Sequence, residues 1–440
     1  MDGAIKFLQP KELIRKKRDG KSLSAEEITN FVFAYTKGEI PDYQASAFLM
    51  AVFFKGLSFS ETKALTKAML NSGKRLNLTS FRLPKIDKHS TGGVGDKISL
   101  VLFPLVSACG LIIPSFAGRS LGHTGGTIDK LESIPNFRTN LSEKEILSQL
   151  RRIGLVIVEP TEEICPADKK IYALRDATET VESLPLIAGS ILSKKLAEGI
   201  DGLILDVKVG KGAFLKNLTA ARRLAKLMIK LSKEFGVETS ALLTNMDEPL
   251  GRSVGNSLEI METIEALKGN IEPDIKEITF ALGEEMLILG KVVTNRKEAR
   301  KILEEKLMIG EGLKRFQKLI EAQGGDVKVI EDYRRLPQAK YRLGAQSLKT
   351  GYLKSIPADI VSQLLIELGG GRKRKEDTID PSVGFLFLKK RGGHLEKGEI
   401  FAEIYCNDEK KGDEVRKELE ERIQISERKV KKRKLIYERL

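Results

Sequence analysis

The chain reads KHSTGGVGDKIS over residues 88–99, where three glycines lie between an extended apolar run and a helix-like run. A second glycine-rich stretch, at 118–135, has similar surroundings. Such turns direct backbone N–H groups and a helix N-terminus toward one point, which makes an anion site. The hydroxyls of Ser90, Ser99 and Thr127 and the cation of Lys88 lie in or beside the loops, and this donor set suits a phosphate group.

The same glycines also allow a purely structural interpretation, because Gly-Gly pairs often only provide positive φ angles in tight turns. The Walker pattern is absent, and the dinucleotide pattern Gly-x-Gly-x-x-Gly is not cleanly met. The loop composition therefore leaves an anion site and structural turns both open.

The 440 residues are enough for two or three domains, and a hydrophobic content of 41% supports a sizeable core. No apolar run reaches the ~20 residues that span a bilayer, and residues 1–17 lack the apolar segment of a signal peptide. The three cysteines are widely spaced. We therefore expect a cytoplasmic protein without membrane partners or a disulfide framework.

The formal net charge is +14, and residues 426–439 are rich in lysine and arginine. A solvated basic surface is the preferred interpretation, and a contact with a polyanion is the alternative. A basic field would also attract anionic ligands toward a site.

Residues 1–73 are predicted to be helical. Ser24 and Glu27 form a capping box at the start of one helix, and apolar residues follow it at helical spacing. Helical segments without strands indicate a separate helical lobe.

From residue 85 onward, short strands alternate with helices. Strands are expected at 86–89, 111–114, 155–158, 202–207 and 239–244, and helices at 100–108 and 217–235. This alternation predicts an α/β fold with a mainly parallel sheet. Ligands of such sheets bind beyond the carboxyl ends of strands, where both glycine loops fall.

The literal sequence of the loops carries a resemblance. Residues 88–96 and 121–135 closely resemble the two signature segments of the pyrimidine nucleoside phosphorylases and thymidine phosphorylases, the class II nucleoside phosphorylases. The resemblance continues in the family's order at 172–176, 190–195, 206–210, 255–257, 351–352, 370–372 and Asp380.

The resemblance implies a small all-α domain, formed by 1–73 and 167–198, and a large α/β domain, formed by 80–166 and 199–337. A C-terminal α+β portion with the basic tail covers 338–440. It also implies an active site in the cleft between the two lobes and a homodimer formed through the N-terminal helices.

The resemblance also implies the phosphate-binding residues Lys88, Ser90, Ser99, Ser115, Ala117 and Thr127. Ala117 stands where the family usually has serine, and Ser120 replaces a glycine, so phosphate affinity is in question. The backbone N–H of Ala117 and the hydroxyl of Ser115 are the expected compensation. Ser115 also matches the position associated with sugar preference, and its small side chain favours broad pyrimidine specificity.

Four residues match the family's base-binding positions, namely Tyr172, Arg175, Ser190 and Lys194. Ser190 and Lys194 are spaced i, i+4, so they share a helix face. Taken alone, such a face is usually solvated. By resemblance, Arg175 and Lys194 bind the base carbonyls and stabilise negative charge on the leaving base.

His89 is by resemblance the residue that donates a proton to the leaving base, although a structural histidine explains the sequence equally well. His123 and Thr124 are expected to shape the second loop. Asp206 and Lys208 are expected to form a buried ion pair.

The resemblance further implies a monovalent cation, potassium. Its ligands would be backbone oxygens of Gly95, Lys97, Leu250 and Ser253 and the carboxylate of Glu262. No residue cluster indicates a catalytic transition metal, and no organic cofactor is expected.

The expected activity is reversible phosphorolysis of thymidine, deoxyuridine and uridine to the free base and α-(deoxy)ribose 1-phosphate, with inorganic phosphate as co-substrate. One alternative is a phosphoribosyltransferase of related fold. The other is a catalytically altered homologue that binds nucleic acid, a partner that we do not otherwise expect.

Overall fold

The chain divides between a helical unit and a larger unit built on β-sheets. The computed structural model describes residues 9–119, 126–372, 374 and 377–440. The helical unit consists of Met1–Ser80, Pro160–Asp201 and Arg222–Thr239, and the larger unit contains the rest. Among the described residues, no helix combines the length and the apolar character that crossing a membrane requires.

The helical unit is built from segments that are far apart in the sequence. Its helices are α1 (Pro10–Arg18), α2 (Ala25–Thr36), α3 (Asp42–Lys55), α4 (Phe59–Asn71), α8 (Pro166–Ala177), α9 (Leu184–Ala197) and most of α10 (Leu218–Glu234). Ser24 and Glu27 form the expected capping box at α2. Ser58 and Glu61 form a second capping box at α4.

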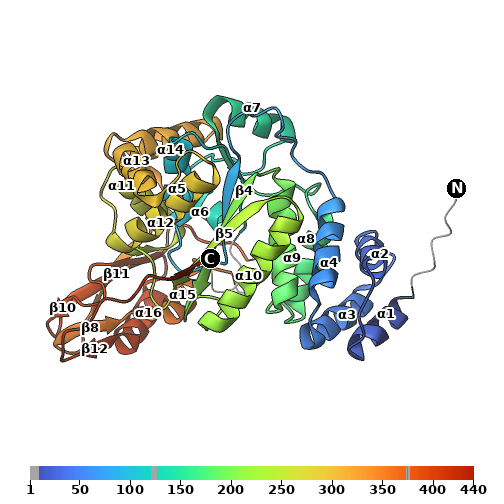
Figure 1. Cartoon of the computed structure of the whole chain (residues 1–440). Coiled ribbons are helices and arrows are strands. Elements are labelled where there is room, and N and C mark those ends of the chain that lie inside the picture. Colours follow the sequence, from blue (N-terminus) through green and yellow to red (C-terminus); the bar gives the residue numbers. More distant parts are fainter. Residues whose placement is uncertain (1–8, 120–125, 373, 375–376) are drawn as a thin grey trace. The chain divides into compact units, whose positions relative to one another are not determined.

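Buried side chains join the early and late helices of this unit. Figure 1 shows the blue helices α1–α4 beside the green helices α8 and α9. The rings of Phe31 and Phe48, whose centroids lie 4.2 Å apart, belong to their common core.

The helical unit also takes in 222–239, which the sequence-based boundaries assigned to the α/β domain. The reason is the packing of α10 against α4 and its N-terminal flank. The ammonium of Lys230 lies 4.2 Å from the ring centroid of Phe59. Lys63 and Glu234 form an ion pair at 2.5 Å.

The larger unit begins with alternating strands and helices. They are β1 (Ile86–Ser90), α5 (Ile98–Ser107), β2 (Ile113–Phe116), α6 (Thr127–Leu131), α7 (Glu143–Ile153), β3 (Leu155–Val158), β4 (Gly202–Val209), β5 (Glu238–Asn245), β6 (Ser253–Val254), α11 (Asn256–Leu267), α12 (Pro273–Leu289), α13 (Arg296–Met308) and α14 (Glu311–Ala322). One sheet has the order β1-β4-β5-β13, and β2 pairs in parallel with β3. A parallel bridge between Lys85 and Ile112 connects these two sheets.

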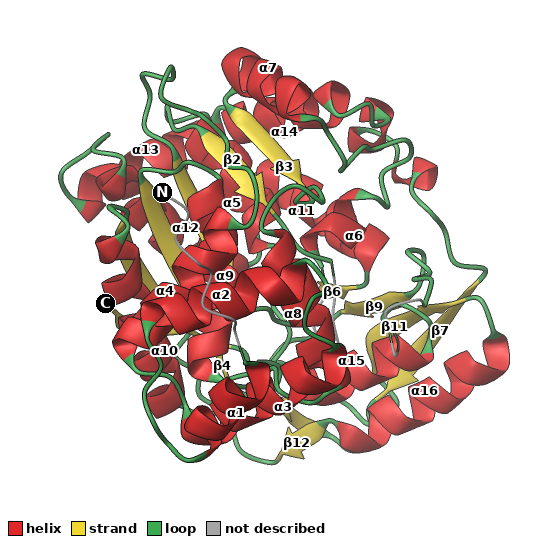
Figure 2. Cartoon of the chain, turned by 90° about the vertical axis from the view of Figure 1, so that its right-hand side faces the viewer, coloured by secondary structure: helices red, strands yellow, loops and turns green. Residues whose placement is uncertain are grey.

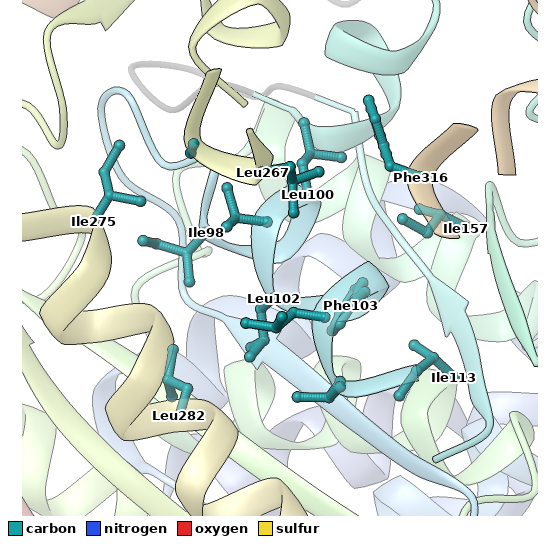
Figure 3. Packing of buried hydrophobic residues seen from close by; sticks show 14 of the residues in the cluster. Ile98, Leu100, Leu102, Phe103, Ile113, Ile157, Leu267, Ile275, Leu282 and Phe316 are labelled. Carbon is teal, nitrogen blue, oxygen red and sulfur yellow. The ribbon is translucent and has the colours of Figure 1, made fainter. Parts of the chain in front are cut away.

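The core of this α/β part surrounds α5, which is buried along its whole length. Figure 3 shows Leu102 and Phe103 of α5 among Leu282 of α12 and Ile113 of β2. A helix that is apolar all round needs such cover on every side. The buried helix holds the first glycine loop at its N-terminal end.

The C-terminal part has a core of its own. Its elements are β7 (Tyr341–Gln346), β8 (Gly351–Ser355), α15 (Ala358–Glu367), β9 (Gly384–Phe387), β10 (His394–Leu395), β11 (Ile400–Cys406), α16 (Glu409–Arg422), β12 (Gln424–Ser426) and β13 (Ile436–Arg439). One sheet has the order β6-β9-β11-β7, and α16 packs beside it (Figure 2). The mixed α+β portion predicted from 338 onward is therefore present.

The basic tail forms part of the fold. Its end, β13, pairs antiparallel with β5 at the edge of the α/β sheet. Arg439 lies 2.9 Å from Glu285, and Arg433 lies 2.7 Å from Asp247. The sequence predicted a solvated basic surface here, and Lys429, Lys431 and Lys432 are exposed. The structure adds an edge strand and two paired arginines, which the sequence did not indicate.

Candidate active site

The first glycine loop connects β1 to α5. Strand β1 runs parallel to β4, with Ser90 opposite Asp206. The side chain of Asp96 accepts hydrogen bonds from Ile98 N at 3.3 Å and from Ser90 Oγ at 2.6 Å. Asp96 therefore accepts the first N–H of α5 and orients the serine at the end of β1.

Two of the predicted phosphate ligands, one on β1 and one on α5, meet beside this loop. Lys88 Nζ donates to Ser99 Oγ at 3.2 Å and lies 3.5 Å from the carboxylate of Asp206. Lys208 Nζ lies 2.7 Å from the same carboxylate and 3.9 Å from Asp96. The expected ion pair between Asp206 and Lys208 is confirmed, and it is completely buried.

The charges of this cluster stabilise one another. Burial by itself would raise the pKa of Asp96, but the ammonium groups of Lys208, Lys88 and Lys130 hold that pKa well below its usual range. Burial would lower the pKa of Lys208, but Asp206 and Asp96 raise it above its usual value. Both groups are thus charged at neutral pH, and the ammonium groups of Lys88 and Lys208 are held beside the loop by the two carboxylates.

The two residues proposed to compensate for the missing serine have other partners. The backbone N–H of Ala117 donates to Val158 O at 2.9 Å, which extends the pairing of β2 with β3. The hydroxyl of Ser115 is buried and donates to Asp87 at 3.3 Å. The compensation expected from the sequence is therefore wrong for the N–H of Ala117, because the sheet uses that donor.

The second loop leads into α6, where Thr127 is the first residue. From this helix, Lys130 Nζ reaches back to Asp96 O at 2.8 Å and so connects the two loops. Ser120, His123 and Thr124 lie outside the described residues.

An arginine of the C-terminal part holds α6 in place. The guanidinium of Arg372 contacts both carboxylate oxygens of Asp129, at 2.8 and 3.1 Å. This bidentate geometry fixes orientation as well as distance.

In the helical unit, the structure brings Ser190 and Lys194 together on α9. Lys194 Nζ donates to Ser190 O at 2.6 Å and to Ser190 Oγ at 3.1 Å. It also forms an ion pair with Asp168 of α8, whose side chain is buried. The ammonium itself is partly exposed, at 28% for the side chain, and so remains accessible to a ligand.

The other two predicted base-binding residues also lie side by side. The Arg175 guanidinium lies 5.6 Å from the ring centroid of Tyr172. It is fully buried and donates to the carbonyl oxygens of Thr180, Val181 and Leu186. In this structure, Arg175 therefore orders the turn between α8 and α9.

Burial changes the pKa of both side chains. It lowers the pKa of Arg175 from its usual value, and it raises the pKa of Tyr172 to about 12. The phenol of Tyr172 is therefore neutral at physiological pH and can donate a hydrogen bond.

His89 lies on β1 between Lys88 and Ser90, opposite Leu205 of β4, and is half-buried. Side chains alternate along a strand, so His89 and Lys88 point to opposite faces of the sheet. The structure leaves the role of His89 as a prediction.

At the place predicted for potassium, the structure puts the side chain of Lys97. Its Nζ donates to Leu250 O at 2.8 Å and to Ser253 O at 3.1 Å, and it lies 2.9 Å from the carboxylate of Glu262. The sequence-based prediction used the backbone oxygen of Lys97 and overlooked its ammonium group.

Several residues with a clear positional role were missed by the sequence analysis. They are Asp96, Lys130, Asp168 and Arg372. For Asp96, a signal was present, because a short carboxylate side chain in a turn before a helix often accepts nearby backbone N–H groups. The contacts of the other three join segments distant in sequence and leave no local pattern.

Family models match three parts of the chain. "Glycosyl transferase family, a/b domain" matches 82–313, "Glycosyl transferase family, helical bundle domain" matches 11–73, and "Pyrimidine nucleoside phosphorylase C-terminal domain" matches 352–426. Together with the helical unit, the α/β sheet and the glycine loop, they define a glycosyl transferase fold.

Comparison with curated relatives identifies the family within this class of glycosyl transferases. The chain is 46% identical to the pyrimidine-nucleoside phosphorylase of Geobacillus stearothermophilus, over 98% of this chain and 99% of the relative. It is 45% identical to the enzyme of the same name from Bacillus subtilis, over 90% of this chain and 92% of the relative. The chain belongs to the pyrimidine-nucleoside phosphorylase family.

A solved structure with a similar fold is anthranilate phosphoribosyltransferase from Thermus thermophilus. The TM-score is 0.55 at 16% identity, and the match covers 71% of this chain and 99% of that chain. At this identity, the similarity concerns the fold alone.

Proposed function

We propose that this chain catalyses reversible phosphorolysis of pyrimidine nucleosides, with thymidine, deoxyuridine and uridine as substrates. A phosphate oxygen forms a bond to the anomeric carbon while the bond from that carbon to the base breaks. The base leaves with both electrons, and inversion gives α-(deoxy)ribose 1-phosphate. The names and the near-complete coverage of the curated relatives support this activity.

The observation that carries the proposal is the contact of Lys88 with Ser99 at the carboxyl end of β1. A buried ammonium beside a hydroxyl gives phosphate a charge-assisted hydrogen bond and a neutral donor. Lys208 keeps Asp206 neutralised when Lys88 turns toward a phosphate. These groups hold phosphate as the nucleophile, a task of positioning and charge stabilisation.

On the base side, Lys194 and Ser190 provide the donors. The 3.1 Å contact between Lys194 Nζ and Ser190 Oγ places an ammonium and a hydroxyl side by side on α9. A pyrimidine base has two carbonyl acceptors, and negative charge builds up on them as the base leaves. The ammonium of Lys194 stabilises that charge.

The test is base release from thymidine, deoxyuridine and uridine, with and without inorganic phosphate. We expect release only with phosphate. The ratio of the rates on uridine and thymidine measures the sugar preference that Ser115 suggests. No phosphate-dependent release from any of the three nucleosides would refute the proposal.

Two further measurements examine the two alternatives. Base consumption with a pyrophosphorylated sugar, independent of phosphate, would indicate a phosphoribosyltransferase. Salt-sensitive nucleic-acid binding without phosphorolysis would indicate the second alternative. Replacing the exposed Lys429, Lys431 and Lys432 by glutamine tests that binding without removing β13.

Restoring a hydroxyl at Ala117 is expected to strengthen phosphate binding. The Ala117→Ser variant keeps the backbone bond to Val158 and adds one donor near the start of the second loop. A net hydrogen bond of ~0.5–1.5 kcal/mol corresponds to a phosphate KM lowered ~2–10-fold. Steady-state kinetics at varied phosphate measure this, with Ala117→Val as the control without a hydroxyl. An unchanged KM in the serine variant would mean that position 117 does not reach the phosphate.

Replacing His89 by asparagine is expected to lower kcat about tenfold, the loss of one hydrogen bond to the leaving base. The thermal unfolding midpoint should change little, because His89 is only half-buried. Full turnover in the variant would remove the proposed role of His89 as proton donor.

We further propose a homodimer formed through α3. Tyr43 and Phe54 of this helix are about three-quarters exposed, and Met50 lies on the same face at helical spacing. Exposed large apolar side chains on one helix face are typical of a protein interface. The Phe54→Glu variant is expected to sediment as a monomer and the wild type as a dimer. A monomeric wild type would contradict the proposal.

A further inference from the structure

The turn at 249–253 presents its carbonyl oxygens to the first glycine loop and the following segments, an arrangement that suits a cation. Leu250 N donates to Val94 O at 3.1 Å. A Cβ added to Gly95 would lie 2.6 Å from Leu250 O, so the turn and the loop touch where only glycine fits. A cationic group that binds these carbonyl oxygens therefore also fixes the first glycine loop, which follows Ser90 and contains Asp96.

The ammonium of Lys97 has a complete set of partners at this turn. An ammonium group has three N–H donors, and Lys97 Nζ has three acceptors within 3.1 Å, namely Leu250 O, Ser253 O and Glu262 Oε2. The residue is fully buried. Burial would lower the pKa of Lys97, but Glu262, Glu259 and Asp274 raise it above its usual value, so the group is charged.

The main-chain oxygens expected to bind potassium have other partners. Gly95 O accepts from Lys97 N at 2.9 Å, and Lys97 O accepts from Leu100 N at 3.0 Å as α5 begins. Glu262 accepts from Arg252 N and Ser253 N at 2.7 and 2.8 Å. Because the Lys97 ammonium also stands among Leu250 O, Ser253 O and Glu262, the residues present do not fit a bound potassium ion.

A second lysine satisfies the carbonyls that Lys97 does not reach. Lys390 Nζ donates to Pro249 O at 2.7 Å and to Gly251 O at 2.5 Å. It also lies 3.3 Å from Asp274, a carboxylate that accepts from Gly251 N. Two ammonium groups thus share the carbonyls of one turn.

We infer that the Lys97 ammonium is a built-in monovalent cation, and that this protein needs no potassium to order its first glycine loop. An ammonium group and a potassium ion carry the same charge and are of similar size. A covalently attached cation does not dissociate when the potassium concentration falls. The inference concerns the folded structure and does not depend on the proposed activity.

The test is thermal unfolding in potassium, sodium and choline chloride at equal ionic strength. The wild type is expected to unfold at the same midpoint in all three salts. The Lys97→Thr variant removes the ammonium. It leaves space for a potassium ion among Leu250 O, Ser253 O and Glu262. We expect its midpoint to be lower in choline chloride and to rise by a few degrees, saturably, with potassium. Lys97→Met fills the space without a charge, so its midpoint should be lower in every salt.

The matched control is Lys17→Thr, which breaks a buried ion pair of 2.9 Å with Glu61 in the helical unit. Its midpoint should fall equally in the three salts. A wild-type midpoint that rises with potassium overturns the inference, whether or not the variants fold. A Lys97→Thr variant that folds but does not respond to potassium overturns it as well.

Discussion

The Lys88→Met variant is expected to lose ~10–150-fold in kcat/KM for phosphate, because it removes a charge-assisted hydrogen bond worth ~1.5–3 kcal/mol from the bound anion. Lys88 is buried, and its ammonium lies within hydrogen-bond distance, 3.2 Å, of the predicted phosphate ligand Ser99. A methionine of similar length keeps the packing and removes only the charge. The loss should appear mainly in the KM for phosphate and leave the KM for thymidine nearly unchanged.

The structure separates this loss from unfolding. Asp206 keeps its closer partner, Lys208 at 2.7 Å, when Lys88 is replaced, so no buried carboxylate is left unpaired. Circular dichroism and the thermal midpoint should therefore change little. The control is Lys17→Met, a buried lysine of the helical unit, which should lower stability and leave the phosphate KM intact. A phosphate KM that Lys88→Met does not change would exclude Lys88 as a phosphate ligand.

The Lys194→Met variant is expected to lose ~100–1000-fold in kcat on thymidine. Its ammonium is partly exposed beside Ser190, where it can meet negative charge on the leaving base. The loss should be smaller for 5-fluorodeoxyuridine, because its more acidic base leaves with less assistance. An equal loss on both nucleosides would mean that Lys194 does not stabilise the leaving group.

The buried Asp168 calls for a control, since Lys194→Met leaves this carboxylate without its ion-pair partner. An uncompensated buried charge is costly to the fold. The double variant Asp168→Asn with Lys194→Met removes both charges and should recover the thermal midpoint but not the activity. Lys169→Met, an exposed lysine of α8, should keep full activity. Recovery of activity in the double variant would show that Lys194 acts only on stability.

Much of the fold could be predicted from local patterns. The strand expected at 155–158 is β3 itself, and the helix expected at 217–235 is α10 within one residue at each end. The capping box of Ser24 and Glu27 marks the start of α2. These features depend on neighbouring residues, so the sequence contains their full signal. The assignment of 222–239 to the helical unit depends on contacts with Phe59 and Lys63. Because these residues are distant in the sequence, local patterns did not indicate it.

The candidate site shows the same division. The resemblance indicated Lys88 with Ser99 and Ser190 with Lys194, and each pair is in contact. It could not indicate that the N–H of Ala117 is used by β3, because strand pairing joins residues distant in the chain.

By itself, the sequence determined the family, the two-part architecture and the polar residues of both loops, since motifs and periodicity are local properties. Only the tertiary structure decided what Lys97 does. A lysine at this position could equally well be an exposed loop residue. Its carbonyl partners belong to the backbone and therefore have no sequence signature. The ammonium acts as a bound cation only because folding brings oxygen atoms of Leu250, Ser253 and Glu262 to within 3.1 Å of it. Three-dimensional proximity of carbonyl oxygens is the physical quantity that one-dimensional patterns do not contain.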